Sequence, residues 1–332
     1  MEQATSLQEL ARDRRFRRVA VACGVFDGVH RGHQAIIDAL HNIAEKTSSA
    51  SVVLTFEPHP RAVLSPGTPP PRLTTPTQKL RLLSRTGVHA AVVLEFTPEL
   101  AGLHPAGFVT EYLRGPGFEV TAVCVGSTWR FGARGTGDVE FLRRSGRKHG
   151  FQVVSVPEFH WYGQPVSSTR IREAVSAGRV RKAARMLGRP YSVHARVVRG
   201  RGMGEKALQC PTANLLTTHL LLPPPGVYAA RARIYSPPAE QTEQVDLRES
   251  ATRDAVAYIG SAPTFHPCGT PPRQTLEVHL FNFKRDLYEK ELEVDFLEFI
   301  RSEKQFEQPG NLAEQVQRDC RAAQRAIERR HK

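Results

Sequence analysis

The stretch VAVACGVFDGVHRGHQAIIDALHNIAEKT, residues 19–47, decides the fold. Its first eight residues are apolar or small and predict a β-strand that ends at Phe26. From Gly32 onward, apolar side chains recur at helical spacing, which predicts an amphipathic helix. A strand that passes directly into a helix is typical of an α/β sheet, so the segment DGVHRGH is expected to be the turn at the strand's carboxyl end.

The same alternation of short apolar runs and amphipathic stretches continues to about residue 188. Further strands are expected at 50–56, 90–96, 120–126 and 151–159. Helices are expected at 76–87, 105–117, 137–150, 168–178 and 179–188. Strands with few polar residues between helices predict a parallel sheet covered on both faces, a Rossmann-like α/β domain.

The pattern changes after GRPY (188–191), where short alternating runs are separated by turns rich in glycine and proline. Strands are expected at 191–200, 226–236, 254–260, 274–283 and 290–300, with a last helix at 309–330. This pattern predicts an antiparallel sheet or small β-barrel with a terminal helix. We therefore expect two domains, residues 1–188 and 189–332.

Composition indicates a soluble globular protein, with 40% hydrophobic and 24% charged residues in 332. We expect no membrane span, because no apolar run is long enough to cross a bilayer. We expect no secretory signal, because the N-terminus has no apolar segment with a small-residue cleavage site. The five cysteines are scattered and form no C-x-x-C pair, which argues against a disulfide framework and a structural zinc site. A reducing cytoplasm is the expected compartment.

The formal net charge of +13 is concentrated in the first half of the chain. Residues 1–188 have an excess of ten basic side chains over acidic ones, against three for residues 189–332. Such a charge attracts nucleotide phosphates or nucleic acid, and it is equally typical of solvated helix faces. The sequence lacks interleaved aromatic and basic residues and any nucleic-acid-binding module, so no nucleic-acid partner is expected.

The turn DGVHRGH favours phosphate binding, because free N–H groups at a helix start attract anions at the carboxyl edge of an α/β sheet. Gly28 and Gly32 allow close backbone approach, and His30 and His33 can hydrogen-bond phosphoryl oxygens. The lysine of a Walker A loop and the G-x-G-x-x-G spacing are absent. An ordinary glycine-rich loop remains an alternative, and a metal site is a weaker one.

Two further segments have both a chemical and an ordinary structural interpretation. Ser168 and Thr169 at a predicted helix start, with Arg172 one turn later, suit phosphate binding, although a plain N-cap explains the hydroxyls as well. Thr212 and Asn214 in the segment PTAN have oxygen ligands suited to Mg²⁺, although such a segment is often only a turn.

The pattern G-x-F-D-G-x-H-x-G-H at 24–33 resembles the first signature of the bacterial bifunctional riboflavin kinase/FAD synthetases, members of the HxGH nucleotidyltransferase superfamily. The resemblance runs from about residue 19 to 320 and includes SSTRIR, similar to that superfamily's second phosphate motif. The supporting stretches, in order, are TFEPHPRAVL (55–64), VGSTWRFGARGTGDVEFL (125–142), VSSTRIREAVSAGRV (166–180), LGRPYSV (187–193), PTANL (211–215), GVYAARA (226–232) and LEVHLFNFKRDLYEKELEVDFLEFIRSEKQF (276–306).

The resemblance implies that the first domain transfers AMP from ATP to the phosphate of FMN, releasing pyrophosphate, and that the second phosphorylates riboflavin. It implies riboflavin, FMN, FAD and ATP as ligands, Mg²⁺ as cofactor, and no membrane partner; a homo-oligomer is a further expectation. The implied catalytic residues are His30, His33 and Glu277, with Glu277 as the base for the ribityl hydroxyl. The implied binding residues are Gly24, Phe26, Asp27, Gly28, Gly32, Ser168, Thr169, Arg172 and Gly204 for ATP and phosphate, His59, Thr128 and Arg130 for flavin, and Thr212 and Asn214 for Mg²⁺.

The sequence departs from the family pattern near the kinase site, and two interpretations follow. The departures there are Glu205, Gln209, Cys210, Tyr258 and Ala262. A lost glycine before PTAN obstructs phosphate approach, and a glutamate in place of an arginine has the wrong charge. The alternative is therefore an FAD synthetase whose kinase-like domain is impaired or regulatory. For Glu277, a solvent-facing position in an alternating strand is the ordinary interpretation.

Overall fold

The computed structural model describes residues 1–65, 67, 69–198, 212–236, 248–249, 252–261, 274–283, 285–288, 290–304, 306 and 309–330. The chain forms two compact units, one of Met1–Pro70 with Pro76–Ser168 and the other of Pro71–Thr75 with Thr169–Lys332. The break after Ser168 lies before the predicted boundary at 188. The two helices between these positions are α8 (Ser168–Ser176) and α9 (Val180–Leu187).

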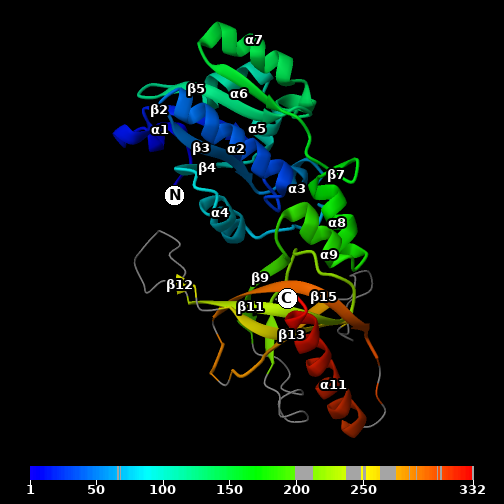
Figure 1. Ribbon diagram of the computed structural model, residues 1–332. Helices are drawn as coiled ribbons and strands as arrows, with labels where there is room; N and C mark the ends of the chain where they lie inside the picture. Colours follow the sequence, from blue (N-terminus) through cyan, green and yellow to red (C-terminus); the bar gives the residue numbers. More distant parts are fainter. Residues whose placement is uncertain are drawn as a thin grey trace. The chain divides into compact units, whose positions relative to one another are not determined.

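The first unit contains a six-stranded sheet in which every pairing is parallel (Figure 1). Its strands, in spatial order, are β1 (Glu2–Ala4), β4 (Ala90–Glu95), β3 (Ala50–Glu57), β2 (Arg18–Cys23), β5 (Glu119–Gly126) and β6 (Gln152–Val156). The α/β fold with a parallel sheet is confirmed. The edge strand β1 was not predicted, because three residues are too few to show an alternation.

Both faces of this sheet are buried, as the apolar strands require. Along β2, Val19 and Val21 belong to one apolar cluster, whereas Ala20 and Ala22 belong to another with Leu40 of α2 (Arg31–Lys46). Helix α2 therefore packs on one face, where Figure 1 shows it along the sheet. The remaining helices of the unit are α1 (Leu7–Leu10), α3 (Pro60–Leu64), α4 (Pro76–Ser84), α5 (Pro98–Gly102), α6 (Pro105–Tyr112) and α7 (Val139–His149), with 3₁₀ turns η1 (Arg14–Phe16) and η2 (Ala133–Gly135) and a hairpin of β7 (His160–Trp161) and β8 (Gln164–Pro165).

The strand order places β2 between β3, which follows it in the chain, and β5, which lies on its other side. From β2 the chain continues to β3 and then to β4 on one side of β2. It then crosses to β5 and β6 on the other side of β2. Ligands of open α/β sheets bind at such a reversal, beside the carboxyl ends of the strands. The turn 27–33 follows β2 directly and therefore lies at this position.

The described strands of the second unit form a closed barrel, as predicted (Figure 1). Six strands form the ring, which closes where β11 pairs with β15, and all pairings are antiparallel. In ring order they are β11 (Gly226–Ser236), β13 (Arg253–Ser261), β14 (Gln274–Leu280), β10 (Ala213–Leu215), β9 (Tyr191–Val198) and β15 (Glu291–Ser302), with β12 (Arg248–Glu249) beside β11. Strands β10 and β12 were not predicted.

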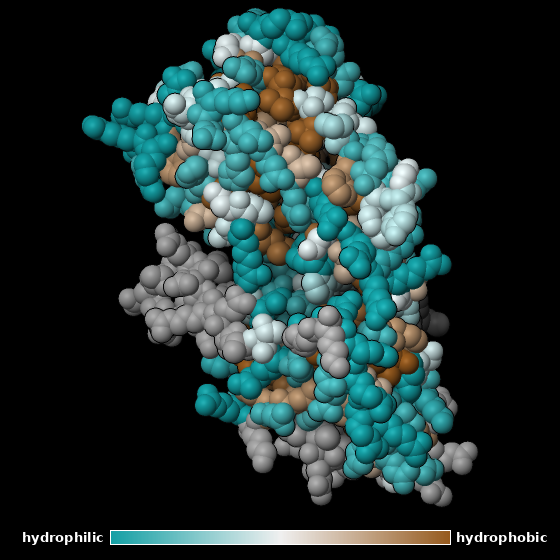
Figure 2. Space-filling model, viewed as in Figure 1, coloured by the Kyte–Doolittle hydropathy of each residue, from teal (hydrophilic) through white to brown (hydrophobic). Residues whose placement is uncertain are grey.

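Alternation along each strand separates the barrel's interior from its outer face. Val193, Val294 and Ala232 lie opposite one another across β9, β15 and β11 and are buried. The terminal helix α11 (Pro309–Glu328) packs its Ala323 and Ile327 against the outer face. Its other side is hydrophilic in Figure 2.

A buried polar cluster lies on the outer face of β9, β11 and β15. The Arg233 guanidinium is 2.8 Å from the Asp295 carboxylate and 3.4 Å from that of Glu293. Glu293 also accepts hydrogen bonds from Ser192 at 2.9 Å and Tyr235 at 3.0 Å. Burial raises the pKa of Asp295 to about 6, and Arg233 opposes that rise.

Candidate active sites

The turn after β2 is built from backbone conformations that side chains rarely adopt. The strand ends at Cys23, three residues before the predicted end at Phe26, because Phe26 has a φ of 53° and interrupts the extended chain. Gly28 has a φ of 85° and Val29 a φ of 40°. Only glycine adopts such values at little cost, so the buried ring of Phe26 and its neighbours must hold the turn in place.

His30 and His33 meet at the start of α2, which begins at Arg31 with His30 as its N-cap. The Nδ1 atom of His30 accepts a hydrogen bond from the His33 backbone N–H at 3.3 Å, and the two rings stack with centroids 3.6 Å apart. Because Nδ1 accepts, the ring proton of neutral His30 lies on Nε2, where it is a donor. A Cβ at Gly32 would lie 3.1 Å from the His30 ring, so the glycine makes room for this arrangement.

A hydrogen bond joins Ser168 of the second predicted phosphate motif to the turn of the first. The Ser168 hydroxyl donates to the backbone carbonyl of Asp27 at 2.9 Å, across 141 residues of chain. Asp27 itself is buried. Thr169 and Arg172 belong to the second unit, where the Arg172 Nε donates to the carbonyl of Pro71 at 2.8 Å. Ser168 therefore supports the turn of the first motif.

The residues predicted to bind flavin follow the two strands that flank β2. His59 follows β3 and is the N-cap of α3, where its side chain accepts a hydrogen bond from the Arg61 N–H. Thr128 and Arg130 follow β5 and are exposed, with Arg130 3.6 Å from Asp138. All three lie at the carboxyl edge of the sheet, on the same edge as the turn. The Gly24 N–H donates to Leu54 of β3 and ties β2 to that strand.

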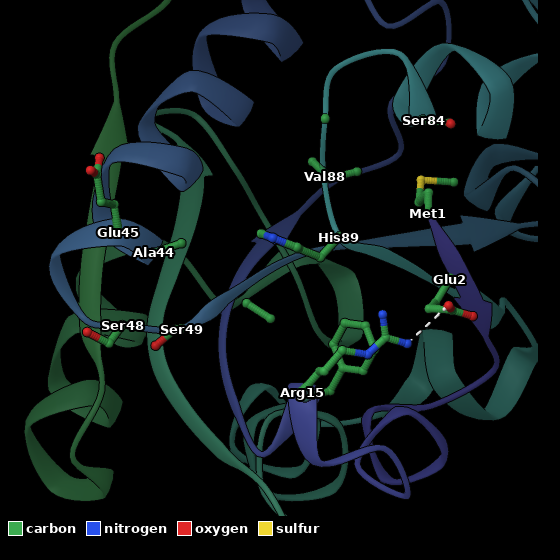
Figure 3. A pocket seen from close by; sticks show the side chains of 13 residues that line it. Met1, Glu2, Arg15, Ala44, Glu45, Ser48, Ser49, Ser84, Val88 and His89 are labelled. Carbon is green, nitrogen blue, oxygen red and sulfur yellow. Dashed lines mark hydrogen bonds and ion pairs between the residues drawn. The ribbon is translucent and has the colours of Figure 1, made fainter.

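A separate depression of about 730 Å³ lies at the opposite edge of this sheet (Figure 3). Its lining includes Glu2 and Ala50, which begin β1 and β3, and His89, which precedes β4. Arg15 and Glu2 form an ion pair at 3.2 Å in its wall. Because these residues lie at the amino ends of the strands, the depression is not part of the turn site.

In the barrel, three predicted or noted residues form one row across β10, β14 and β13. Asn214 pairs with Glu277, which pairs in turn with Tyr258. Residues paired in this way extend their side chains to the same face of a sheet. The Thr212 hydroxyl donates a hydrogen bond to the Glu277 carboxylate, so Thr212 joins the same group.

The environment of Glu277 suits a general base. Burial raises the pKa of this half-buried carboxyl, and the hydrogen bond from Thr212 acts in the opposite direction. The neighbouring Tyr258 hydroxyl donates to Glu303. Burial and that acidic partner raise the pKa of Tyr258, which keeps the hydroxyl protonated.

Several predicted positions lie outside the described residues, namely Gly204, Glu205, Gln209, Cys210 and Ala262. Among the residues that the structure describes, no group of three or more His, Cys, Asp or Glu side chains could hold a metal ion. No helix within the described ranges is both long and apolar enough to span a membrane.

Sequence reasoning missed Lys79, a lysine on α4 that is only 5% exposed beside the carboxyl end of β3. The spacing of apolar residues along α4 could have indicated that Lys79 is buried. Lys79, Leu82 and Leu83 follow the i, i+3, i+4 spacing of an apolar face, and the lysine occupies a position where an apolar residue is expected.

Comparison with known proteins adds a family to this geometry. The FAD synthetase family matches residues 13–170, and the riboflavin kinase family matches residues 187–327. The bifunctional riboflavin kinase/FMN adenylyltransferase of Escherichia coli K12 is 33% identical over 296 residues, which cover 89% of this chain and 88% of the relative. That of Pseudomonas fluorescens is 34% identical and covers 92% of each chain.

A solved structure described as a macrolide-efflux protein from Streptococcus pneumoniae has a similar fold. It aligns with a TM-score of 0.76 and 27% identity, over 92% of this chain and 94% of the other. The two family matches and the relatives agree with the sheet and barrel described above. The chain therefore belongs to the family of bifunctional riboflavin kinases/FMN adenylyltransferases.

Proposed function

We propose that this chain makes FMN from riboflavin in its second unit and FAD from FMN in its first, with ATP as co-substrate in both steps. Family membership over most of the chain supports both activities. The observation that most directly supports nucleotidyl transfer is the stacked His30–His33 pair at the start of α2. It lies where an α/β sheet binds anionic ligands.

In the first unit, a phosphate oxygen of FMN attacks the α-phosphorus of ATP and pyrophosphate leaves. His30 and His33 donate hydrogen bonds to phosphoryl oxygens as charge moves onto the leaving group. Ser168 holds the turn through the Asp27 carbonyl. We assign ATP binding to Gly24, Phe26, Asp27, Gly28, Gly32, Ser168, Thr169 and Arg172, and flavin binding to His59, Thr128 and Arg130.

In the second unit, Glu277 removes the proton from the ribityl hydroxyl, and the resulting oxygen attacks the γ-phosphorus of ATP. The bond from the γ-phosphorus to the bridging oxygen breaks, and ADP leaves. The raised pKa of Glu277 favours this proton transfer. The donor set fits Mg²⁺, since the Thr212 hydroxyl and the Asn214 side chain place hard oxygen ligands beside a carboxylate. Thr212 and Asn214 would hold the ion, which neutralises phosphate charge when bound.

A second candidate function is an FAD synthetase whose barrel has lost kinase turnover. Tyr258 favours it, because its ring occupies the row beside Glu277 and its hydroxyl is engaged by Glu303. In this reading the barrel binds flavin without phosphorylating it.

Two parallel assays separate these functions. The purified protein is incubated with ATP and Mg²⁺ and either riboflavin or FMN, and the flavins are separated by chromatography. The bifunctional enzyme yields FMN and FAD from riboflavin. FAD from FMN alone supports the second candidate, and no product from either flavin overturns both. We also expect a cytoplasmic protein without nucleic-acid partners, and a homo-oligomer that sedimentation can test.

A further inference from the structure

Lys79 is a buried cation bound at the carboxyl end of β3. Its ammonium donates to the Phe56 carbonyl at 3.0 Å and to the Thr55 hydroxyl at 3.3 Å. The Glu57 carboxylate is 3.6 Å away. Removing an ammonium group from water is unfavourable unless partners compensate for its lost hydration. A leucine on this helix face would avoid that cost, so the position of the lysine calls for another reason.

The second partner links this cation to the neighbouring strand. Thr55 is fully buried, and its hydroxyl donates to the Val25 carbonyl at 3.0 Å. A hydroxyl has one proton to donate. Since Thr55 gives that proton to Val25, its contact with Lys79 is one in which it accepts. The chain of donors therefore runs from Lys79 through Thr55 to Val25, and each bond polarises the next.

Val25 is where this chain of hydrogen bonds reaches the candidate active site. Its carbonyl belongs to the same peptide plane as the N–H of Phe26, the first residue of the turn with a positive φ. Phe26 and Val29 have backbone conformations that residues with side chains rarely adopt, so the turn relaxes unless contacts outside it fix its ends. The Thr55 hydroxyl fixes the peptide at the entrance, and Ser168 fixes the Asp27 carbonyl further along.

We infer that Lys79 is a positioning residue for adenylyl transfer, which acts through Thr55 and the Val25 peptide to hold the turn bearing His30 and His33. This inference rests on the proposed function of the first unit. Lys79 itself does not touch the reacting groups in this role. Its loss therefore lowers the rate with which bound substrates react more than it weakens the binding of FMN.

The test compares Thr55→Val and Lys79→Met, alone and combined. Valine has nearly the shape of threonine and lacks the donor to Val25, whereas Thr55→Ser restores it. We expect kcat for FMN adenylylation to fall by roughly 10- to 100-fold in each single variant, with a smaller change in KM for FMN. Because both residues act through one path, the double variant is expected to match the worse single variant.

Two controls separate positioning from general damage. Riboflavin phosphorylation by the same proteins should stay at the unsubstituted rate, and Lys148→Met, at an exposed lysine on α7, should leave both activities unchanged. If Lys79→Met does not fold, the comparison of Thr55→Val with Thr55→Ser tests the inference, because only the serine variant keeps the donor to Val25. Unsubstituted kcat in Thr55→Val, or multiplicative losses in the double variant, overturns the inference. Absence of FAD formation by the unsubstituted protein instead overturns the proposed function.

Discussion

His30 both begins a helix and presents a donor, because its two ring nitrogens have different tasks. Nδ1 accepts from the His33 backbone, while Nε2 is left as the side that carries the proton. His33 has its ring stacked on His30 and lies 5.1 Å from the Phe26 ring. At Glu277 two influences oppose each other. Burial disfavours the ionised carboxylate, and the hydrogen bond from Thr212 stabilises it.

At this scale we predict that His33→Ala abolishes FAD formation and leaves FMN formation intact. The substitution removes the side chain that we propose as a hydrogen-bond donor to phosphoryl oxygens, and loss of such a donor costs about 10²-fold or more in rate. Separate assays with FMN and with riboflavin measure the two steps. Equal loss of both activities would contradict separate sites.

The converse variant is Glu277→Ala, which we expect to remove riboflavin phosphorylation and to spare adenylylation of added FMN. Without a base the ribityl hydroxyl keeps its proton, at a cost of about 10²- to 10⁴-fold in rate. FMN production is followed by chromatography with riboflavin as substrate. Near-unsubstituted production would remove Glu277 from this role.

The first turn of helix α2 contains a glycine, Gly32, although other residues favour a helix more. The glycine makes room for the His30 ring. An alanine at Gly32 would favour the helix by roughly 0.5–1 kcal/mol. The same methyl group would lie 3.1 Å from Cε1 and 3.2 Å from Nδ1 of His30. Contacts this short force the imidazole to move.

We therefore predict that Gly32→Ala lowers FMN adenylylation on the order of tenfold without lowering thermal stability. Gly102→Ala, in the same unit, is the matched control because nothing lies within 4 Å of its added Cβ. Stability is measured by thermal unfolding and activity by FAD formation. Unchanged adenylylation in Gly32→Ala would show that His30 need not hold its observed position.

The sequence predicted the strands and helices that a local pattern of apolar residues determines. It did not predict elements that form only by pairing with segments distant in the chain. Alternating apolar runs identified the longer strands of both units. Strand β10 is defined by hydrogen bonds to β9 and β14, which only the folded chain brings together. The row of Asn214, Glu277 and Tyr258 likewise depends on register between strands. The burial of Lys79 depends on what α4 packs against, which a lysine in the sequence does not show.

On the scale of the whole molecule, acid stability includes a contribution from the buried Asp295. Its folded-state pKa is about 6, above the value of 3.8 for an exposed aspartate. The native state therefore binds a proton there before the unfolded chain does. The free energy of unfolding contributed by this group rises as pH falls through about 6 and levels off below 3.8.

The predicted consequence concerns Asp295→Asn, which cannot titrate. Between pH 7 and pH 5 the unsubstituted protein should gain on the order of 1 kcal/mol relative to the variant. Calorimetric unfolding of both proteins at the two pH values measures this difference, and titrating groups outside the cluster of Arg233, Glu293 and Asp295 cancel in the comparison. A difference that is the same at pH 7 and pH 5 would show that Asp295 does not titrate in this range.

The closure of the barrel by β15 also bears on how the protein is made. This strand pairs with both β9 and β11, so the ring stays open until the ribosome has added about residue 302. The sheet of the first unit is complete once β6 has emerged. During translation, the nascent chain can therefore finish its adenylylating unit while its kinase barrel still lacks a strand. A message truncated before β15 should yield a protein that uses FMN but cannot make it.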